Sequence, residues 1–125
     1  MKGYNKKLGQ WGEELAISFY KSLGYQVIAI NSFVKNQKLV GEVDIIVSKD
    51  QEIVFVEVKT RTSDRFGYPE QAVTVQKKKK LSHAIDQYLL EHQAYEEFFP
   101  RFDILAIDLS SLQPKYNHFE NVTLK

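Results

Sequence analysis

The sequence has no cysteine, few prolines and glycines, and almost no net charge. Its 125 residues include three prolines and six glycines, and the formal charge is +1. Without cysteine the chain can form neither disulfides nor thiolate metal sites, which fits a reducing cytoplasm. No segment approaches the roughly 18 apolar residues that a membrane span needs. The basic first residues, 1–7, are not followed by the apolar run of a signal peptide. We therefore expect a cytoplasmic protein with no membrane partner.

The composition is that of an ordinary folded domain. Hydrophobic residues make up 43% of the chain and charged residues 26%, proportions that are typical of globular proteins. No internal repeat, low-complexity segment or linker rich in Pro, Gly or Ser divides the chain. Residues 1–125 are therefore expected to form a single domain, long enough to bury a core.

The charges are distributed unevenly. Residues 57–80 hold seven Lys and Arg against three acidic residues, whereas residues 81–125 hold three against seven. A basic middle beside an acidic end can steer an anion to one face while the total charge stays near zero. Two ordinary solvated surfaces would give the same counts, so the pattern alone leaves both interpretations open.

Two segments show apolar residues at helical spacing, and they predict helices at 8–23 and 74–92. The stripe of the first consists of Leu8, Trp11, Leu15, Phe19 and Leu23, joined by Gly12 and Ala16. This stripe places Trp11 in the core, and Gly24 follows at a natural C-terminal cap position. Thr74 is a natural N-cap for the second helix.

Runs rich in Val and Ile predict strands at 25–30, 39–48, 52–60 and 102–107, with a further short strand around 117–124. The polar residues 49–51 lie between the second and third runs and predict a turn, so 39–48 and 52–60 are expected to form an antiparallel hairpin. Residues 53–58 are apolar on both faces of their strand. That pattern is typical of a central strand covered by helices on both sides, which predicts an α/β fold.

The hairpin brings acidic residues together. Side chains alternate along a strand, so Glu57 and Lys59 share a face, as do Glu42 and Asp44. If Asp50 and Gln51 form a two-residue turn, Asp44 lies opposite Glu57, and Glu42 lies opposite Lys59. A register shifted by one residue would scatter these groups onto opposite faces.

Folding alone does not require such an arrangement. Neighbouring carboxylates repel each other, and on a covered sheet they also lose hydration. A divalent cation removes the conflict, and Mg²⁺ prefers carboxylate oxygens together with water and phosphate. Lys59 would then orient or deprotonate the attacking water, or neutralise charge that develops on a phosphate. The alternative is a set of cross-strand salt bridges, such as Glu42–Lys59, at a solvated edge.

Several basic residues are candidates for contacts with phosphate. Lys77 lies four residues after Val73 and four before Leu81, on the apolar stripe of its helix, so its side chain is expected to extend toward the acidic cluster. Together with Arg61 and Arg65 it would form a rim that binds the nucleic-acid backbone without reading bases. The three histidines, at 83, 92 and 118, are interpreted as surface or core residues rather than ligands.

The chain resembles the YraN-like family of small bacterial proteins. The residues that carry the resemblance are Gly41-Glu42-Val43-Asp44, residues 54–61, Gly12-Glu13-Glu14-Leu15-Ala16, Gly24-Tyr25, Asn31, Phe66-Gly67-Tyr68-Pro69, Ala72-Val73, Lys77 and Arg101-Phe102-Asp103. That family is similar to the restriction-endonuclease-like superfamily and, within it, to archaeal Holliday junction resolvases. The resemblance implies a three-layer α/β/α core with a mixed central sheet.

The resemblance also implies roles for individual residues. The superfamily motif, an Asp followed by Glu-x-Lys on the next strand, maps onto Asp44 and Glu57-Val58-Lys59. A further Glu on the first helix maps onto Glu13, so Glu13, Asp44 and Glu57 would hold the metal. A Gln-x-x-x-Tyr element found in recombination nucleases is incomplete here, because Val75 stands four residues after Gln71. Because this element is incomplete, Gln71 is assigned only a supporting role. Glu42 is assigned a supporting role as well.

Three hypotheses follow. The first is an endonuclease that uses Mg²⁺ or Mn²⁺ to hydrolyse phosphodiester bonds in DNA, including branched or otherwise structured DNA. Resolvases of the superfamily are dimers, so the resemblance also implies a homodimer. The second is a nucleic-acid-binding or protein-interaction module that retains the fold with little or no cleavage. The third is a scaffold whose acidic cluster is a salt-bridge network without affinity for metal.

Overall fold

The computed structural model of the protein describes residues 2–36, 39–62 and 74–124. Its elements follow one another along the chain as α1 (Lys2–Ser22), β1 (Gln26–Asn36), β2 (Leu39–Lys49), β3 (Glu52–Arg61), α2 (Val75–Glu91), the 3₁₀ turn η3 (Gln93–Tyr95), β4 (Phe99–Asp108) and β5 (Lys115–Phe119). None of the helices in these residues is long and apolar enough to cross a membrane.

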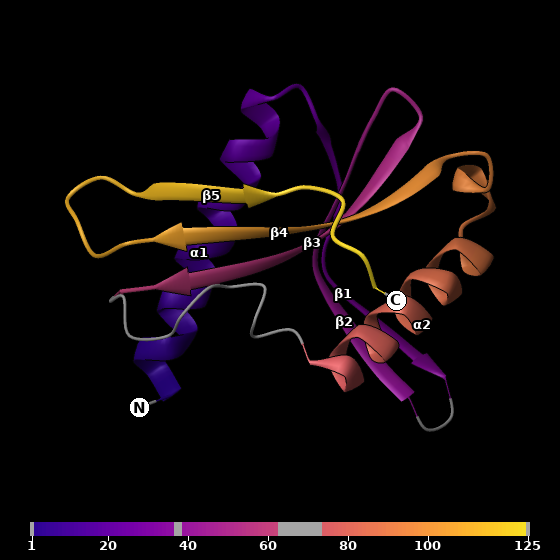
Figure 1. The fold of residues 1–125 in the computed structure, drawn as a ribbon, viewed down its shortest axis with the longest axis horizontal. Helices are drawn as coiled ribbons and strands as arrows, with labels where there is room; N and C mark the ends of the chain where they lie inside the picture. Colours follow the sequence, from indigo (N-terminus) through magenta and orange to yellow (C-terminus); the bar gives the residue numbers. More distant parts are fainter. Residues whose placement is uncertain (1, 37–38, 63–73, 125) are drawn as a thin grey trace.

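The described strands form one mixed sheet in the order β1-β2-β3-β4-β5 (Figure 1). Neighbouring strands run antiparallel except β3 and β4, which are parallel and are connected through α2. The middle strand is β3, and residues 53–57 of it are buried. The predicted α/β fold is confirmed, and the arrangement is consistent with a restriction-endonuclease-like core.

Each face of the sheet is covered by one helix. Phe55 belongs to the cluster that packs against α2 and contacts Tyr88 edge-on, with ring centroids 5.8 Å apart. The next residue, Val56, points to the other face and packs in the cluster that contains Tyr20 of α1. Residues on both faces of β3 are therefore buried, as the sequence of this strand predicts.

The β2–β3 hairpin has the predicted turn and register. Asp50 and Gln51 have φ angles of 51° and 67°, the left-handed conformation that both central residues of a type I′ turn adopt. Lys49 pairs with Glu52, and the ladder continues in this register as far as Ile45 and Val56. The register prediction is confirmed for these pairs.

Helix α1 buries only part of the predicted stripe. Trp11 is 49% exposed and Leu23 is 41% exposed, so the prediction that Trp11 lies in the core is wrong. Among residues 9–22 of α1 the buried ones are Gly12, Ala16 and Tyr20, which recur every four residues. A Cβ atom on Gly12 would overlap the methyl group of Thr60 on β3. Small side chains thus let α1 lie close to the sheet and displace the larger Trp11 from the contact.

The remaining boundaries differ from the predictions by a few residues. α1 begins at Lys2 rather than at residue 8, and Gly24, with a φ of 92°, follows it as predicted. Thr74 caps α2 by accepting a hydrogen bond from the Lys77 N–H at 3.1 Å. The first strand extends from the predicted 25–30 to Asn36, and the last strand occupies 115–119 rather than 117–124.

Candidate functional site

The acidic residues predicted from the hairpin lie just past the last pair of the β2–β3 ladder. The ladder ends at Ile45–Val56, so the predicted facing pairs Asp44–Glu57 and Glu42–Lys59 are not part of it. The Val58 N–H instead donates a hydrogen bond of 2.8 Å to Oδ2 of Asp44. A carboxylate thus takes the place that a strand carbonyl would otherwise occupy, and it fixes the Asp44 side chain beside β3.

Asp44 lies in an electrostatically unfavourable position. Burial raises the pKa of its carboxyl from 3.8 to about 6, and the hydrogen bond from Val58 opposes this shift only in part. The negative charges of Glu57, Glu42 and Glu13 are smaller contributions to this raised pKa. All four predicted acids are therefore close enough to interact, even though the ladder does not pair them.

Glu57 is the more deeply buried member of the cluster, with 8% of its surface exposed. Its Oε1 forms ion pairs with the Lys59 ammonium, at 3.4 Å, and with the Lys77 ammonium. Its Oε2 is buried and has no hydrogen-bond partner in the part of the chain that the structure describes. A buried carboxylate oxygen without a partner carries a desolvation cost, which makes it a natural acceptor for a ligand.

Glu13 reaches the cluster from α1, and the close approach of Gly12 to Thr60 of β3 sets the position of that helix. Asn31 of β1 donates a hydrogen bond of 3.2 Å from its Nδ2 to Oε2 of Glu13. Asn31 has a φ of 52°, a left-handed conformation that Asn adopts more readily than most residues. The resemblance included Asn31, but the periodicity analysis gave it no role.

The basic residues take separate places. Lys59 pairs with Glu57 of its own strand, so the alternative Glu42–Lys59 bridge is not formed among the described residues. Lys77 extends from α2 toward the cluster, as its place on the apolar stripe predicts.

Arg61 lies at the end of β3, beside Asp108 of β4. Arg65 and Gln71 lie outside the described residues.

Among the described residues, the carboxylates of the cluster offer oxygen donors to a divalent ion without forming a complete shell. Within 2–36, 39–62 and 74–124, no three side chains of His, Cys, Asp or Glu are already arranged around a common metal position. The oxygens present nevertheless fit Mg²⁺ or Mn²⁺, which are commonly bound by one or two carboxylates with water and phosphate completing the shell. The partnerless Oε2 of Glu57 and the destabilised carboxylate of Asp44 are the donors that a cation would satisfy.

Comparison with known proteins identifies the family. Residues 12–107 match the model of the uncharacterised protein family UPF0102. The chain belongs to this family. The UPF0102 protein of Syntrophomonas wolfei is 42% identical over 119 residues, which cover 94% of this chain and 97% of the relative. The UPF0102 protein of Alkaliphilus oremlandii is 40% identical over 118 residues, with the same coverage. That of Clostridium perfringens is 38% identical over 116 residues, 93% of this chain and 91% of the relative.

The predicted YraN-like membership is therefore confirmed. The segment that matches the UPF0102 model includes the cluster on α1, β2 and β3, from Glu13 through Asp44 to Glu57, and it also includes Lys77 of α2. The site described above is thus part of the region that defines membership in the family.

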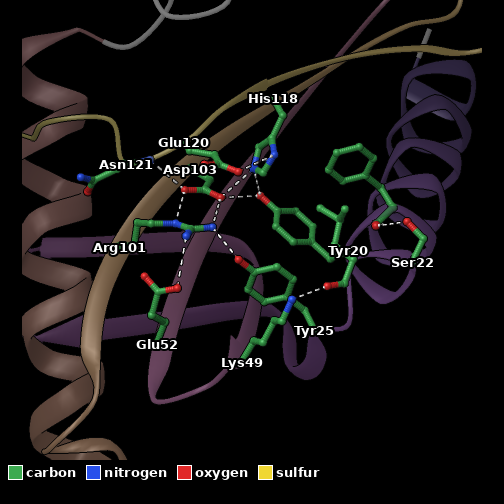
Figure 2. A network of polar contacts seen from close by, with 12 residues as sticks. Tyr20, Ser22, Tyr25, Lys49, Glu52, Arg101, Asp103, His118, Glu120 and Asn121 are labelled. Atoms are coloured by element: carbon green, nitrogen blue, oxygen red, sulfur yellow. Dashed lines mark hydrogen bonds and ion pairs between the residues drawn. The ribbon is translucent and has the colours of Figure 1, made fainter.

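A second polar cluster in this UPF0102 chain was not predicted as a unit (Figure 2). Its centre is Asp103 of β4, whose side chain is fully buried. The donors are Tyr20 Oη at 2.9 Å, Arg101 Nε at 2.9 Å and Nη2 at 3.0 Å, and the Asn121 N–H at 3.0 Å. The His118 Nε2 also lies 2.8 Å from Oδ2 of Asp103.

The Asp103 cluster has a structural explanation. Burial alone would raise the pKa of Asp103, but the hydrogen bonds from His118, Arg101, Asn121 and Tyr20 outweigh it and lower the pKa to about 2. Every partner comes from a segment that the cluster ties to the sheet: α1, the β4 strand itself, β5 and the segment after it. His118 is therefore a packed residue, as expected. The sequence signal for the cluster was the pair Arg101 and Asp103 inside an otherwise apolar strand.

Proposed function

We propose that this UPF0102 protein is a divalent-metal-dependent nuclease that hydrolyses phosphodiester bonds in DNA. The observation that carries the proposal is the pair of carboxylates at the end of the β2–β3 ladder, that of Glu57 buried and that of Asp44 half-buried. Asp44 has a pKa raised to about 6 by burial and by neighbouring acids. Glu57 keeps a buried oxygen without a partner. Both features weaken the folded protein, and both are relieved when a cation binds.

Each residue has a role in this proposal. Asp44, Glu57 and Glu13 hold Mg²⁺ or Mn²⁺ through carboxylate oxygens, and Asn31 keeps Glu13 in place through the bond described above. The bound ion supplies polarisation of a phosphoryl oxygen and acidifies a coordinated water. Lys59 extends from the same face of β3 as Glu57. There it orients the attacking water or offsets the charge that builds up on the phosphate.

The substrate is held mainly through its backbone. Arg61, Arg65 and Lys77 form the basic rim, and contacts of this kind bind phosphates with little regard to sequence. Glu42 adds negative charge near Asp44, and Gln71 remains a supporting candidate. By resemblance to junction resolvases, we further propose structured or branched DNA as substrate, a homodimer as the working form and the cytoplasm as the compartment.

One observation favours a second candidate function. Glu57 is already paired with Lys59 and Lys77, and the described residues contain no ready-made metal shell. A nucleic-acid-binding module that retains the fold and its basic rim would have the same features. Such a module would bind DNA equally well with or without a divalent ion and would cut nothing.

Cleavage of a labelled panel separates the two candidates. The panel contains linear, forked and four-way-junction DNA, together with RNA, incubated with Mn²⁺. We expect the wild type to cut at least one DNA, and Glu57→Gln to bind that DNA with unchanged affinity without cutting it. Glu14→Gln is the matched control, because Glu14 is an exposed acid on α1 next to Glu13. Binding without cleavage by the wild type across the panel contradicts the nuclease proposal and supports the binding module.

A further inference from the structure

Lys77 is held on α2 in a way that aims it at the acidic cluster. Its backbone N–H donates to the cap residue Thr74 at 3.1 Å, which fixes the first turn of the helix. Leu81, four residues later on the same stripe, is 4% exposed. The Lys77 side chain therefore starts from the buried face of α2 and crosses to β3, where its ammonium pairs with Oε1 of Glu57.

The neighbouring lysines do not share this position. Lys79 and Lys80 are exposed, and among the described residues only Lys77 of the run 77–80 takes part in an ion pair. The side chain of Lys77 retains 36% of its surface exposed, so its charge has access both to the cluster and to solvent. The flexible four-carbon side chain of a lysine can carry its ammonium group from the cluster to solvent without any movement of the helix.

The charges around Glu57 cannot all stay where they are when a cation binds. Two ammonium groups already meet at Oε1, and the charge of Asp44 also acts on Lys77. A divalent ion held by Asp44 and Glu57 would add positive charge beside both lysines, and like charges repel strongly in a partly buried site. Lys59 stands two residues from Glu57 on the same face of β3, so its ammonium remains beside the site. Lys77 reaches Glu57 from α2, so rotation of its side chain can carry its ammonium away.

We propose that Lys77 is an exchangeable counter-ion. Its ammonium group pairs with the Glu57 carboxylate while the site holds no metal. When the metal binds, the ammonium moves to a backbone phosphate of the nucleic acid. This inference rests on the proposed function. An exchangeable Lys77 makes metal and nucleic acid bind cooperatively, because a phosphate that pairs with Lys77 leaves the Glu57 carboxylate available to the metal. By linkage the metal must raise the affinity for nucleic acid by the same factor.

The inference is tested by titrating Mn²⁺ calorimetrically into the wild type, Lys77→Met and Lys79→Met, each without nucleic acid and then with a saturating, uncleaved DNA from the panel. We expect DNA to tighten Mn²⁺ binding to the wild type by about fivefold or more. Lys77→Met should bind Mn²⁺ at least about fivefold more tightly than the wild type without DNA, and DNA should then add little. Lys79→Met should behave as the wild type.

Two further variants guard against misreading the result. Lys77→Arg keeps the charge and should retain the coupling between Mn²⁺ and DNA. Lys77→Gln removes the charge and should behave as Lys77→Met. Thermal unfolding verifies that each variant is folded. If the wild type binds Mn²⁺ and Lys77→Met binds it no more tightly, the counter-ion role is wrong while the proposed nuclease function stands. If the wild type binds no Mn²⁺ with or without DNA, both proposals are overturned.

Discussion

The carboxylate of Asp44 accepts a hydrogen bond of 2.8 Å from the backbone N–H of Val58, one residue past Glu57. This contact ties β2 to β3 at the point where their ladder ends. It holds a carboxylate among other acids although its burial raises its pKa to about 6. A side chain kept in an unfavourable state by a specific hydrogen bond is a common mark of a functional site.

The first prediction concerns the stability cost of Asp44. Because its pKa is raised in the folded state, the stabilising contribution of the protonated carboxyl is complete below about pH 4 and is lost as the pH rises through about 6. Asp44→Asn retains an oxygen for the Val58 N–H and removes the charge. We expect this variant to be more stable than the wild type by about 2 kcal/mol at pH 8, and equally stable near pH 4.

Urea unfolding in EDTA at both pH values measures this difference. Asp86→Asn, at an exposed position of α2, is the matched control and should unfold like the wild type at each pH. A loss of stability in Asp44→Asn at pH 8 would mean that Asp44 is held by favourable contacts rather than against an electrostatic cost.

The second prediction concerns the close approach of α1 to the sheet. A Cβ at Gly12 would overlap the Thr60 methyl, whereas a Cβ at Gly9 would meet nothing within 4 Å. Gly12→Ala should therefore lower the free energy of unfolding by about 1–3 kcal/mol. Gly9→Ala should leave it unchanged or raise it by up to about 1 kcal/mol, since alanine favours the helix. Chemical denaturation measures both, and equal effects would contradict the packing described here.

The third prediction uses the buried Asp103. Hydrogen bonds lower its folded pKa to about 2, so its stabilising contribution is present above the unfolded pKa near 4 and disappears as the pH falls toward 2. Asp103→Asn should cost about 3 kcal/mol at pH 7, because it leaves the half-buried Arg101 without its nearer anion and with only the longer contact to Glu52. The difference in free energy of unfolding between variant and wild type should decrease steadily between pH 5 and pH 2. A gap that is independent of pH would show that the charge of Asp103 has no part in the effect.

The fourth prediction concerns the single tryptophan of the chain. Trp11 is 49% exposed and lies two residues before Glu13 on α1. Its fluorescence should be readily quenched by acrylamide in the native protein, and bound DNA should reduce that quenching if the nucleic acid covers this part of α1. Trp11→Ala should change the stability only slightly. Quenching that DNA leaves unaltered would place the substrate away from α1.

The sequence predicted some features well because they follow from local rules. The positive φ angles of Asp50 and Gln51 belong to the two-residue turn, and that turn fixes the register of β2 and β3. The Thr74 cap and the buried centre of β3 likewise follow from short patterns. These features need no knowledge of distant residues, which is why sequence reasoning reached them.

Other features depend on contacts that periodicity does not contain. Trp11 shares the helical stripe but is displaced from the core, because Gly12 is the residue that meets Thr60. The Asn31–Glu13 hydrogen bond joins residues 18 apart, and the Asp103–Tyr20 hydrogen bond joins residues 83 apart. The end of the ladder at Asp44 also depends on a side chain that replaces a strand hydrogen bond.

The most direct test of the account is a calorimetric titration of Mn²⁺ into the wild type and Asp44→Asn, alone and with a cleavable DNA from the panel. If Asp44 and Glu57 form a metal site, the wild type binds Mn²⁺ and cuts that DNA, whereas folded Asp44→Asn does neither. If the two proteins bind Mn²⁺ equally, or if neither binds it even with DNA present, the buried carboxylates do not form a metal site and the nuclease proposal is wrong.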